Sequence, residues 1–193
     1  MYFDGADDYV MSDISPIAGN TAKTVEAWIK TTANSNPSAG GVQTVIVEMG
    51  LMSTGTRFTL NILNNNAIRI EVEGNGINGT TAVNDGLWHH VAGVYDPLAT
   101  TKVALYLDGN LEASGNLTVT VNTAATGNIQ IGRRCDGIHY FNGTIDEVRV
   151  WNVARTASQI ANNRNVELCN STANLVAYFN RPGSDTGPSN SGS

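Results

Sequence analysis

The pair Glu71 and Glu73 is the first in the sequence whose spacing could serve catalysis. Residues i and i+2 of a strand lie on one face, roughly 6.5 to 7 Å apart, which is near the separation that glycosidases use between two carboxylates. Arg69 occupies the same face of this run. We favour a solvated ladder of alternating charges over catalysis, because spacing alone does not reveal a pocket.

Asp146 lies in the otherwise apolar strand pattern that runs from Thr144 to Trp151. Strict alternation places its side chain on one face with Val148 and Val150. A buried carboxylate without a partner costs several kcal/mol of stability. The pattern therefore predicts that Asp146 meets either a cation or a protein partner, such as an arginine or a set of backbone N–H groups.

Two adjacent histidines, His89 and His90, follow Trp88 on one expected strand and point to opposite faces. A metal site would need a second ligand on the same face, and the spacing of neither an H-x-H nor an H-E-x-x-H motif is present. The third histidine of the chain is His139. We interpret His89 and His90 as structural residues of an internal strand.

The loop from Arg133 to Tyr140 concentrates planar donors and aromatic rings between two expected strands. Such a loop suits sugar hydroxyls, which pair with arginine and aspartate while an aromatic face packs against the ring. The alternative is a structural loop that a disulfide bond of Cys135 holds shut and in which Arg133 or Arg134 pairs with Asp136. Our candidate ligand-binding residues are Arg133, Arg134, Asp136, His139 and Tyr140.

Cys135 and Cys169 are the two cysteines, and neither belongs to a metal-binding spacing. A disulfide bond between them would close a loop of about 35 residues and contribute roughly 3.5 to 4 kcal/mol on the chain-entropy model. Pairing would also indicate an oxidising compartment. Two unrelated thiols remain the alternative, since spacing does not show that the Cα atoms approach each other.

The element that must organise these residues is the hairpin from Leu87 to Gly109. Its runs of β-branched and aromatic residues are bounded by Asp85-Gly86, Asp96-Pro97 and Asp108-Gly109. Both faces of its first strand are largely apolar, so the hairpin should be central in a sandwich of two antiparallel sheets with something covering each face. The sequence therefore predicts an all-β fold.

The remaining pattern predicts short strands and one helix. The helix should begin after Thr156, because Thr156 and Gln159 form a capping box. Asn142-Gly143 predicts a hairpin turn. Beside the central hairpin, strands are expected at 2–3, 9–12, 23–31, 43–48, 57–63, 67–73, 111–114, 117–121, 128–132, 139–141, 144–151 and 175–180.

Length and composition limit the domain organisation and the classes of partner. At 193 residues the chain suits one β domain, which we place at 1–180, followed by a flexible tail of linker composition at 181–193. A net charge of −6 disfavours nucleic acid and anionic membranes as partners. No apolar run is long enough to insert into a bilayer. The start of the sequence fits either a cytosolic protein or a secreted module whose leader and neighbouring domains were cut away from a longer parent chain, and we favour the secreted module.

Five segments of the chain resemble, in order, the laminin-G-like jelly-roll family of the concanavalin A-like lectin and glucanase superfamily. They are Phe3 to Val10, Val25 to Ile29, Asp85 to Ala92, Leu105 to Gly109 and Phe141 to Trp151. The resemblance implies an accessory module with a two-sheet antiparallel jelly-roll β-sandwich, to which the capping box adds one short C-terminal helix. It does not imply one ligand, because relatives bind glycans, bind proteins or only space other domains.

The resemblance also bears on the two carboxylate patterns. Related jelly rolls often hold a structural calcium ion with an aspartate at the place of Asp146, and the Asp4 to Asp8 loop could supply more oxygen ligands. The expected metal ligands are Asp4, Asp8 and Asp146. Related glucanases use Glu-x-Asp-x-Glu, and the run ending in Glu73 lacks the middle aspartate.

The sequence as a whole predicts a non-catalytic carbohydrate-binding or adhesion module of a larger secreted protein. Its partners would be a glycan or another extracellular ligand. A protein-interaction or spacer module is the alternative, and a glycan-cleaving enzyme is less favoured, since no acid/base constellation is evident in the sequence.

Overall fold

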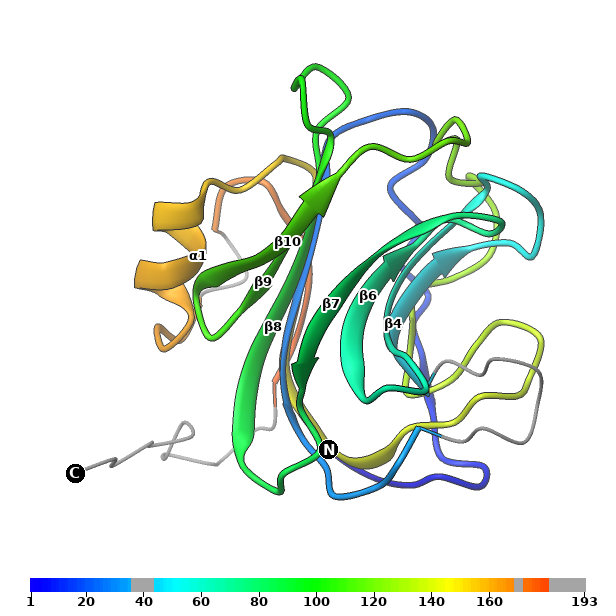
Figure 1. The fold of residues 1–193 in the computed structure, drawn as a ribbon. Helices are drawn as coiled ribbons and strands as arrows, with labels where there is room; N and C mark the ends of the chain where they lie inside the picture. Colours follow the sequence, from blue (N-terminus) through cyan, green and yellow to red (C-terminus); the bar gives the residue numbers. More distant parts are fainter. Residues whose placement is uncertain (36–43, 169–171, 181–193) are drawn as a thin grey trace.

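The computed structural model describes residues 1–35, 44–168 and 172–180. Two antiparallel sheets pack face to face in a β-sandwich (Figure 1). The seven-stranded sheet has the order β1 (Tyr2–Asp4), β12 (Asn142–Trp151), β3 (Lys23–Lys30), β8 (Trp88–Tyr95), β9 (Val103–Leu107) and β10 (Asn110–Gly115), with β13 (Leu175–Phe179) also paired to β12. The six-stranded sheet has the order β2 (Val10–Met11), β11 (Gln130–Ile131), β4 (Thr44–Gly50), β5 (Arg57–Ile62), β6 (Ala67–Glu71) and β7 (Gly76–Ala82).

The predicted central hairpin is confirmed as β8 and β9. Strand β8 pairs with β3 on one side and with β9 on the other. Its outer face carries Ala92 and Val94, which pack with Tyr106 against Ile160 of the helix α1 (Ala157–Asn163). Figure 1 shows α1 outside the seven-stranded sheet. A strand that is apolar on both faces is thus covered by the second sheet inside and by a helix outside.

Helix α1 begins as predicted. The Thr156 side chain accepts a hydrogen bond from Gln159 N, and the Gln159 side chain accepts one from Thr156 N. Both halves of the capping box therefore form, and they satisfy two backbone N–H groups at the helix start.

No helix in the described part of the chain is long and apolar enough to cross a membrane.

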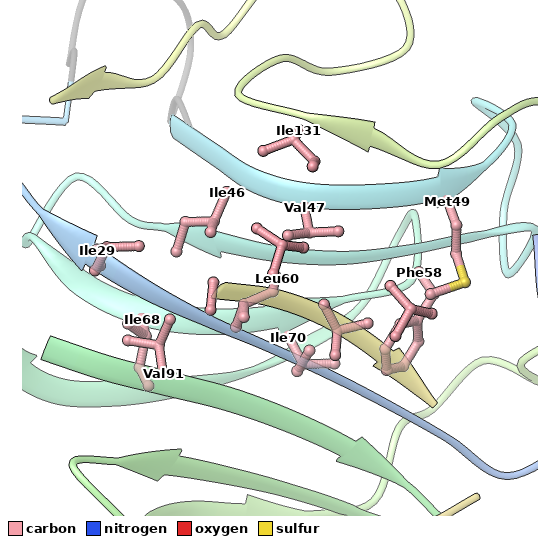
Figure 2. Close-up of a cluster of buried hydrophobic side chains, with 14 of the residues drawn as sticks. Ile29, Ile46, Val47, Met49, Phe58, Leu60, Ile68, Ile70, Val91 and Ile131 are labelled. Atoms are coloured by element: carbon pink, nitrogen blue, oxygen red, sulfur yellow. The ribbon is translucent and has the colours of Figure 1, made fainter. Parts of the chain in front are cut away.

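The core lies between the two sheets (Figure 2). The packing is close where Gly93 of β8 faces Ile70 of β6, because a Cβ atom added to Gly93 would lie 2.0 Å from Ile70 Cδ1. Glycine is therefore required sterically at this position, although its φ angle is ordinary. The labelled side chains of Figure 2 are Ile29, Ile46, Val47, Met49, Phe58, Leu60, Ile68, Ile70, Val91 and Ile131.

Several details of the predicted strand pattern are wrong. Residues 117–121 and 139–141 form no strand. Strand β7, which is largely polar, was not predicted because it lacks the apolar alternation of a strand with a buried face. The predicted turn at Asn142-Gly143 is absent. Both residues belong to β12, where Asn142 pairs with Asp4 and Gly143 with Phe3 of β1.

The face predicted for Asp146 is also wrong. The register between β12 and β3 shifts between Asp146 and Arg149, and Glu147 has a φ of 51°. This β-bulge adds a residue to the alternation. Ile145 and Val148 both point into the core as a result, whereas Asp146 pairs with Trp28 and is half-buried on the outer face.

The open edges of the two sheets meet at β7 and β10. Glu112 of β10 accepts hydrogen bonds from the backbone N–H groups of Thr80 (2.7 Å) and Thr81 (2.8 Å) of β7. Its other carboxylate oxygen accepts a bond from the Thr81 hydroxyl. One side chain therefore joins the edge strand of each sheet.

Candidate functional site

The outer face of the six-stranded sheet carries a row of polar residues. Gln130 of β11, Glu48 of β4, Thr59 of β5 and Glu71 of β6 are register partners in successive strands. All four are buried, although they point away from the core. They are buried because the loop from Arg133 to Phe141 lies on this face, where the Cys135 N–H donates to Glu48 Oε1 at 2.7 Å.

Arg57 is the cation at the centre of this face, and it is only 1% exposed. Its Nη2 lies 2.7 Å from Glu71 Oε1 and 2.8 Å from Glu73 Oε2, and its Nε lies 3.5 Å from Glu48 Oε2. Asn61 Nδ2 donates a further bond to the second oxygen of Glu71. One guanidinium therefore neutralises carboxylates from two strands and from the segment after β6.

This arrangement decides how Glu71 and Glu73 are to be interpreted. They lie on one face, as their spacing predicts, but the prediction of a solvated ladder is wrong for Glu71, which is 6% exposed. Both carboxylates are held by Arg57. Burial raises the pKa of Glu48, while the charge of Arg57 opposes that rise. Glu48, Glu71 and Arg57 therefore form a buried ion network, and the half-buried Glu73 side chain, which is 30% exposed, contacts it from its edge.

The predicted loop residues divide into separate contacts. The Arg133 guanidinium lies 3.4 Å from the centroid of the Tyr9 ring and donates to Gln130 Oε1 at 2.9 Å. Arg134 Nε donates to Asp136 at 2.9 Å, so the ion pair of the structural alternative forms, while the disulfide bond of that alternative stays a prediction. Arg134 and Asp136 thus contact each other, whereas Arg133 lies against Tyr9, the residue before β2.

His139 and Cys135 belong to the part of the loop closest to the sheet. His139 has a φ of 64°, and its carbonyl accepts a bond from Val45 N. Burial and the neighbouring Arg134 charge lower the pKa of His139. Burial and the Glu48 carboxylate raise the pKa of the Cys135 thiol to about 12. Cys135 forms no disulfide bond within the described part of the chain, and Cys169 lies outside it, so the disulfide bond stays a prediction.

Tyr140 lies beside a pocket of about 310 Å³. The pocket lies where the end of β3, the start of β4 and the loop before β12 meet, and Gly5 of the N-terminal loop also contributes. None of the described residues that line it is charged. They are Gly5, Thr31, Ala33, Asn34, Ser35, Thr44, Ile62, Tyr140, Phe141 and Asn142.

The N-terminal loop brings three aspartates together. One ligand atom from each of Asp4, Asp7 and Asp8 lies within 4.8 Å of the others, and all three side chains are exposed. Asp4 Oδ1 accepts from Ala6 N, and Asp8 Oδ2 accepts from Asp4 N. Asp146 is not a member of this group. The structure therefore unites Asp4 with Asp8 but not with Asp146.

The two adjacent histidines have separate partners. His89 Nδ1 lies 2.8 Å from Asp108 Oδ2, and His89 Nε2 lies 3.1 Å from Asp85 Oδ1. Hydrogen bonding to Asp108 raises the pKa of His89. On the opposite face, His90 Nε2 lies 3.3 Å from the buried Glu26. Both contacts agree with the structural interpretation of these residues.

Sequence reasoning missed several members of the site. Glu48 and Arg57 have the clearest available signal, since each is a charged residue in a strand that is otherwise mostly apolar. Asn34 and Asn142 carry no such signal, because asparagine is common in loops and turns. Their place in the pocket depends on strand pairing between segments that are far apart in the sequence.

Several proteins of known structure have a fold similar to that of this chain. A protein from Bacteroides ovatus, described as a candidate carbohydrate binding protein, is similar with a TM-score of 0.69 and 22% identity over 96% of this chain and 52% of its own. This chain therefore spans about half the length of that relative. The Ruminococcus gnavus IT-sialidase CBM40 bound to α2,3 sialyllactose matches with a TM-score of 0.62 and 16% identity over 84% of this chain and 96% of its own.

A third structure comes from an animal protein. Domains LG4-5 of the mouse laminin α1 chain match with a TM-score of 0.54 and 14% identity over 77% of this chain and 40% of their own. No curated protein sequence matches the chain. The family model Laminin_G_3, described as the concanavalin A-like lectin/glucanases superfamily, matches residues 4–161. The chain is therefore a member of this laminin-G-like family of the concanavalin A-like lectin/glucanases superfamily.

Proposed function

We propose that the domain is a non-catalytic carbohydrate-binding module of a larger secreted protein. The observation that carries this proposal is the pocket beside Tyr140, which is open to solvent and lined by hydroxyl, amide and aromatic groups. Such groups suit a saccharide, because they pair with hydroxyls and pack against the C–H surface of the ring. The descriptions of the B. ovatus protein and of the R. gnavus module support the same class of ligand.

The ion network of Arg57 supports a role without catalysis. A glycosidase needs one carboxylic acid and one carboxylate that reach the substrate. Glu48, Glu71 and Glu73 instead all contact Arg57, and the loop with Cys135 covers Glu48. A glycan-cleaving activity is therefore less favoured, and a protein-interaction or spacer role is the alternative to sugar binding.

A structural calcium ion remains part of the proposal. The carboxylates of Asp4, Asp7 and Asp8 are hard oxygen ligands of the kind that calcium prefers, and they lie close enough together to share one ion. Bound there, calcium would neutralise the loop and hold it beside Asn142, whose Nδ2 donates to Asp4 O. Asp146 would take no part as the chain is folded here.

A glycan array tests the proposal. We expect the wild-type domain to bind one class of oligosaccharide, and Tyr140→Ala to lose most of that signal. Tyr2→Ala is the matched control, because Tyr2 is 71% exposed and does not line the pocket. Absence of binding across diverse plant, algal and host glycans would favour the protein-interaction role. Turnover of a bound glycan, abolished in Glu71→Gln, would contradict the non-catalytic role.

A further inference from the structure

We infer that the pocket beside Tyr140 binds the terminal unit of an uncharged saccharide, with Asn34 as a hydrogen-bond donor and Asn142 as an acceptor. This inference rests on the proposed carbohydrate-binding function and names its ligand class and two of its contacts. At about 310 Å³ the pocket is at the small end of the range for ligand sites, so it suits one ring and not a long segment of a chain.

The charge of the described residues around the pocket favours a neutral sugar over an anionic one. A carboxylate or sulfate removed from water needs a cation as partner, and the described lining contains none. The N-terminal loop, which contributes Gly5, carries the aspartates Asp4, Asp7 and Asp8. Arg134 does not line the pocket, and its guanidinium is already bonded to Asp136.

The orientation of the Asn34 amide follows from a chain of hydrogen bonds that begins at the backbone. The Ser35 N–H can only donate, and it lies 2.9 Å from Asn66 Oδ1. Asn66 must then present its NH₂ group to Asn34, where the accepting atom is Oδ1 at 3.2 Å. Asn84 Nδ2 donates to the same Asn34 oxygen at 3.0 Å. Because two donors occupy its oxygen, Asn34 is left with its NH₂ group as a donor.

Asn142 is oriented in the opposite sense. Its Nδ2 donates to the Asp4 carbonyl oxygen at 2.9 Å, which can only accept. The Asn142 backbone carbonyl is also fixed, since it accepts a bond from the Thr31 hydroxyl at 2.7 Å. Within the described part of the chain, Asn142 Oδ1 is left as an acceptor.

The pocket thus offers one fixed donor from the segment after β3 and one fixed acceptor from the start of β12, which are neighbouring strands of the seven-stranded sheet. Neighbouring sugar hydroxyls act as donors and acceptors at once, so they can satisfy both amides, and the Tyr140 hydroxyl can bond to a third. The amides are held before binding, which lowers the entropy lost when a ligand is bound. Neutral amides also avoid the desolvation cost that a charged pair would carry.

Asn34→Asp is the decisive variant. The carboxylate keeps an oxygen that accepts from Asn66 and Asn84, so the fold and its melting temperature should be retained, but it removes the donor. We expect the affinity for neutral oligosaccharides to fall at least 10-fold, since a buried sugar hydroxyl loses its partner. Asn65→Asp is the matched control, because its oxygen only accepts from Ala67 N and it does not line the pocket.

The measurement is a titration of both variants and the wild type with neutral gluco-, galacto-, manno- and xylo-oligosaccharides and with α2,3-sialyllactose and uronate oligomers. Binding of a neutral sugar that Asn34→Asp weakens and Asn65→Asp does not would support the inference. Binding only of the anionic sugars, or equal affinity of Asn34→Asp and wild type, would overturn it and leave the carbohydrate-binding function standing. No binding by any of these sugars would overturn both.

Discussion

The Arg57 guanidinium and the Glu71 carboxylate lie 2.7 Å apart on adjacent strands, and both are nearly inaccessible to water. Each group is costly to bury alone, and the pair is tolerated because each neutralises the other. Arg57 also contacts Glu48 and Glu73, so it is the common partner of the network. The network holds the central strands of the six-stranded sheet under the loop that carries the predicted binding residues.

Replacement of Arg57 by methionine should destabilise the domain strongly. It leaves Glu48 and Glu71 buried without their cation, and removal of one partner of a buried pair costs about 3 to 5 kcal/mol. Urea unfolding at pH 7 measures the change. Arg133→Met is the matched control, and its loss of the contact with Tyr9 and of the bond to Gln130 Oε1 should cost less, about 1 to 2 kcal/mol.

The triple variant Arg57→Met, Glu48→Gln, Glu71→Gln gives a second check on the same network. It removes the charges together with their partner, so it should recover most of the stability that Arg57→Met loses. Equal stabilities of Arg57→Met and Arg133→Met would contradict the buried network.

The contact between His89 and Asp108 should make stability depend on pH. The raised pKa of His89 means that the folded state favours its protonated form. Its contribution is complete below about pH 6.5, the ordinary value for histidine, and is lost as the pH rises through the raised pKa of His89. At the acid end, hydrogen bonds from His89 and His90 N–H outweigh burial and lower the pKa of Asp108, so its contribution is lost only as the pH falls through that lowered pKa.

The measurement is the difference in unfolding free energy between wild type and His89→Ala from pH 4 to pH 9. We expect the difference to be largest near pH 5 to 6 and to decline towards pH 9. His139 has a lowered pKa, so its titration makes the unfolding free energy rise with pH. Because both proteins contain His139, the difference between them cancels this effect. A difference that is constant with pH would show that His89 contributes by packing alone.

Calcium should raise the melting temperature if the N-terminal aspartates bind it. An ion at a hundred times its dissociation constant adds about 2.7 kcal/mol, which shifts the melting of a domain of this size by several degrees. Thermal melts in EDTA and in millimolar calcium measure the shift. Asp8→Asn should abolish it, whereas Asp146→Asn should retain it, because Asp146 lies apart from the group. Identical melts of wild type in both conditions would contradict the site.

The two cysteines can be examined by intact mass after alkylation without reduction. The sequence predicts a disulfide bond between Cys135 and Cys169, and an oxidised, folded sample should then take up no label. Two labels would exclude the bond. A single slow label at pH 8 on a Cys169→Ser variant is expected in either case, since the pKa of the Cys135 thiol is raised to about 12 and little thiolate is present.

The parts of the fold that follow local rules could be predicted. The Thr156 capping box and the hairpin of β8 and β9 each depend on residues that are near one another in the sequence. Family motifs extend this to the sandwich as a whole. The prediction failed in β12, where the bulge at Glu147 changes the alternation of faces. It also failed at Asn142, which was predicted to lie in a turn but pairs with the distant strand β1.

The candidate site could be predicted only in part for the same reason. The loop with Tyr140 was found from its composition, but the amide partners of Asn34 come from positions 66 and 84. Likewise, Arg57 meets Glu71 only when β5 and β6 pair in their observed register. Contacts across strands are set by register, and a single sequence carries no direct signal for register between distant segments.

Glu112 has a consequence for how the domain behaves among other proteins. The N–H groups of an edge strand are a template on which a strand of another molecule can add, and this is a common route to aggregation. Glu112 occupies the N–H groups of Thr80 and Thr81, so that part of β7 has two fewer donors for an incoming strand. Those hydrogen bonds outweigh partial burial and lower the pKa of Glu112, so the protection persists in mildly acidic surroundings.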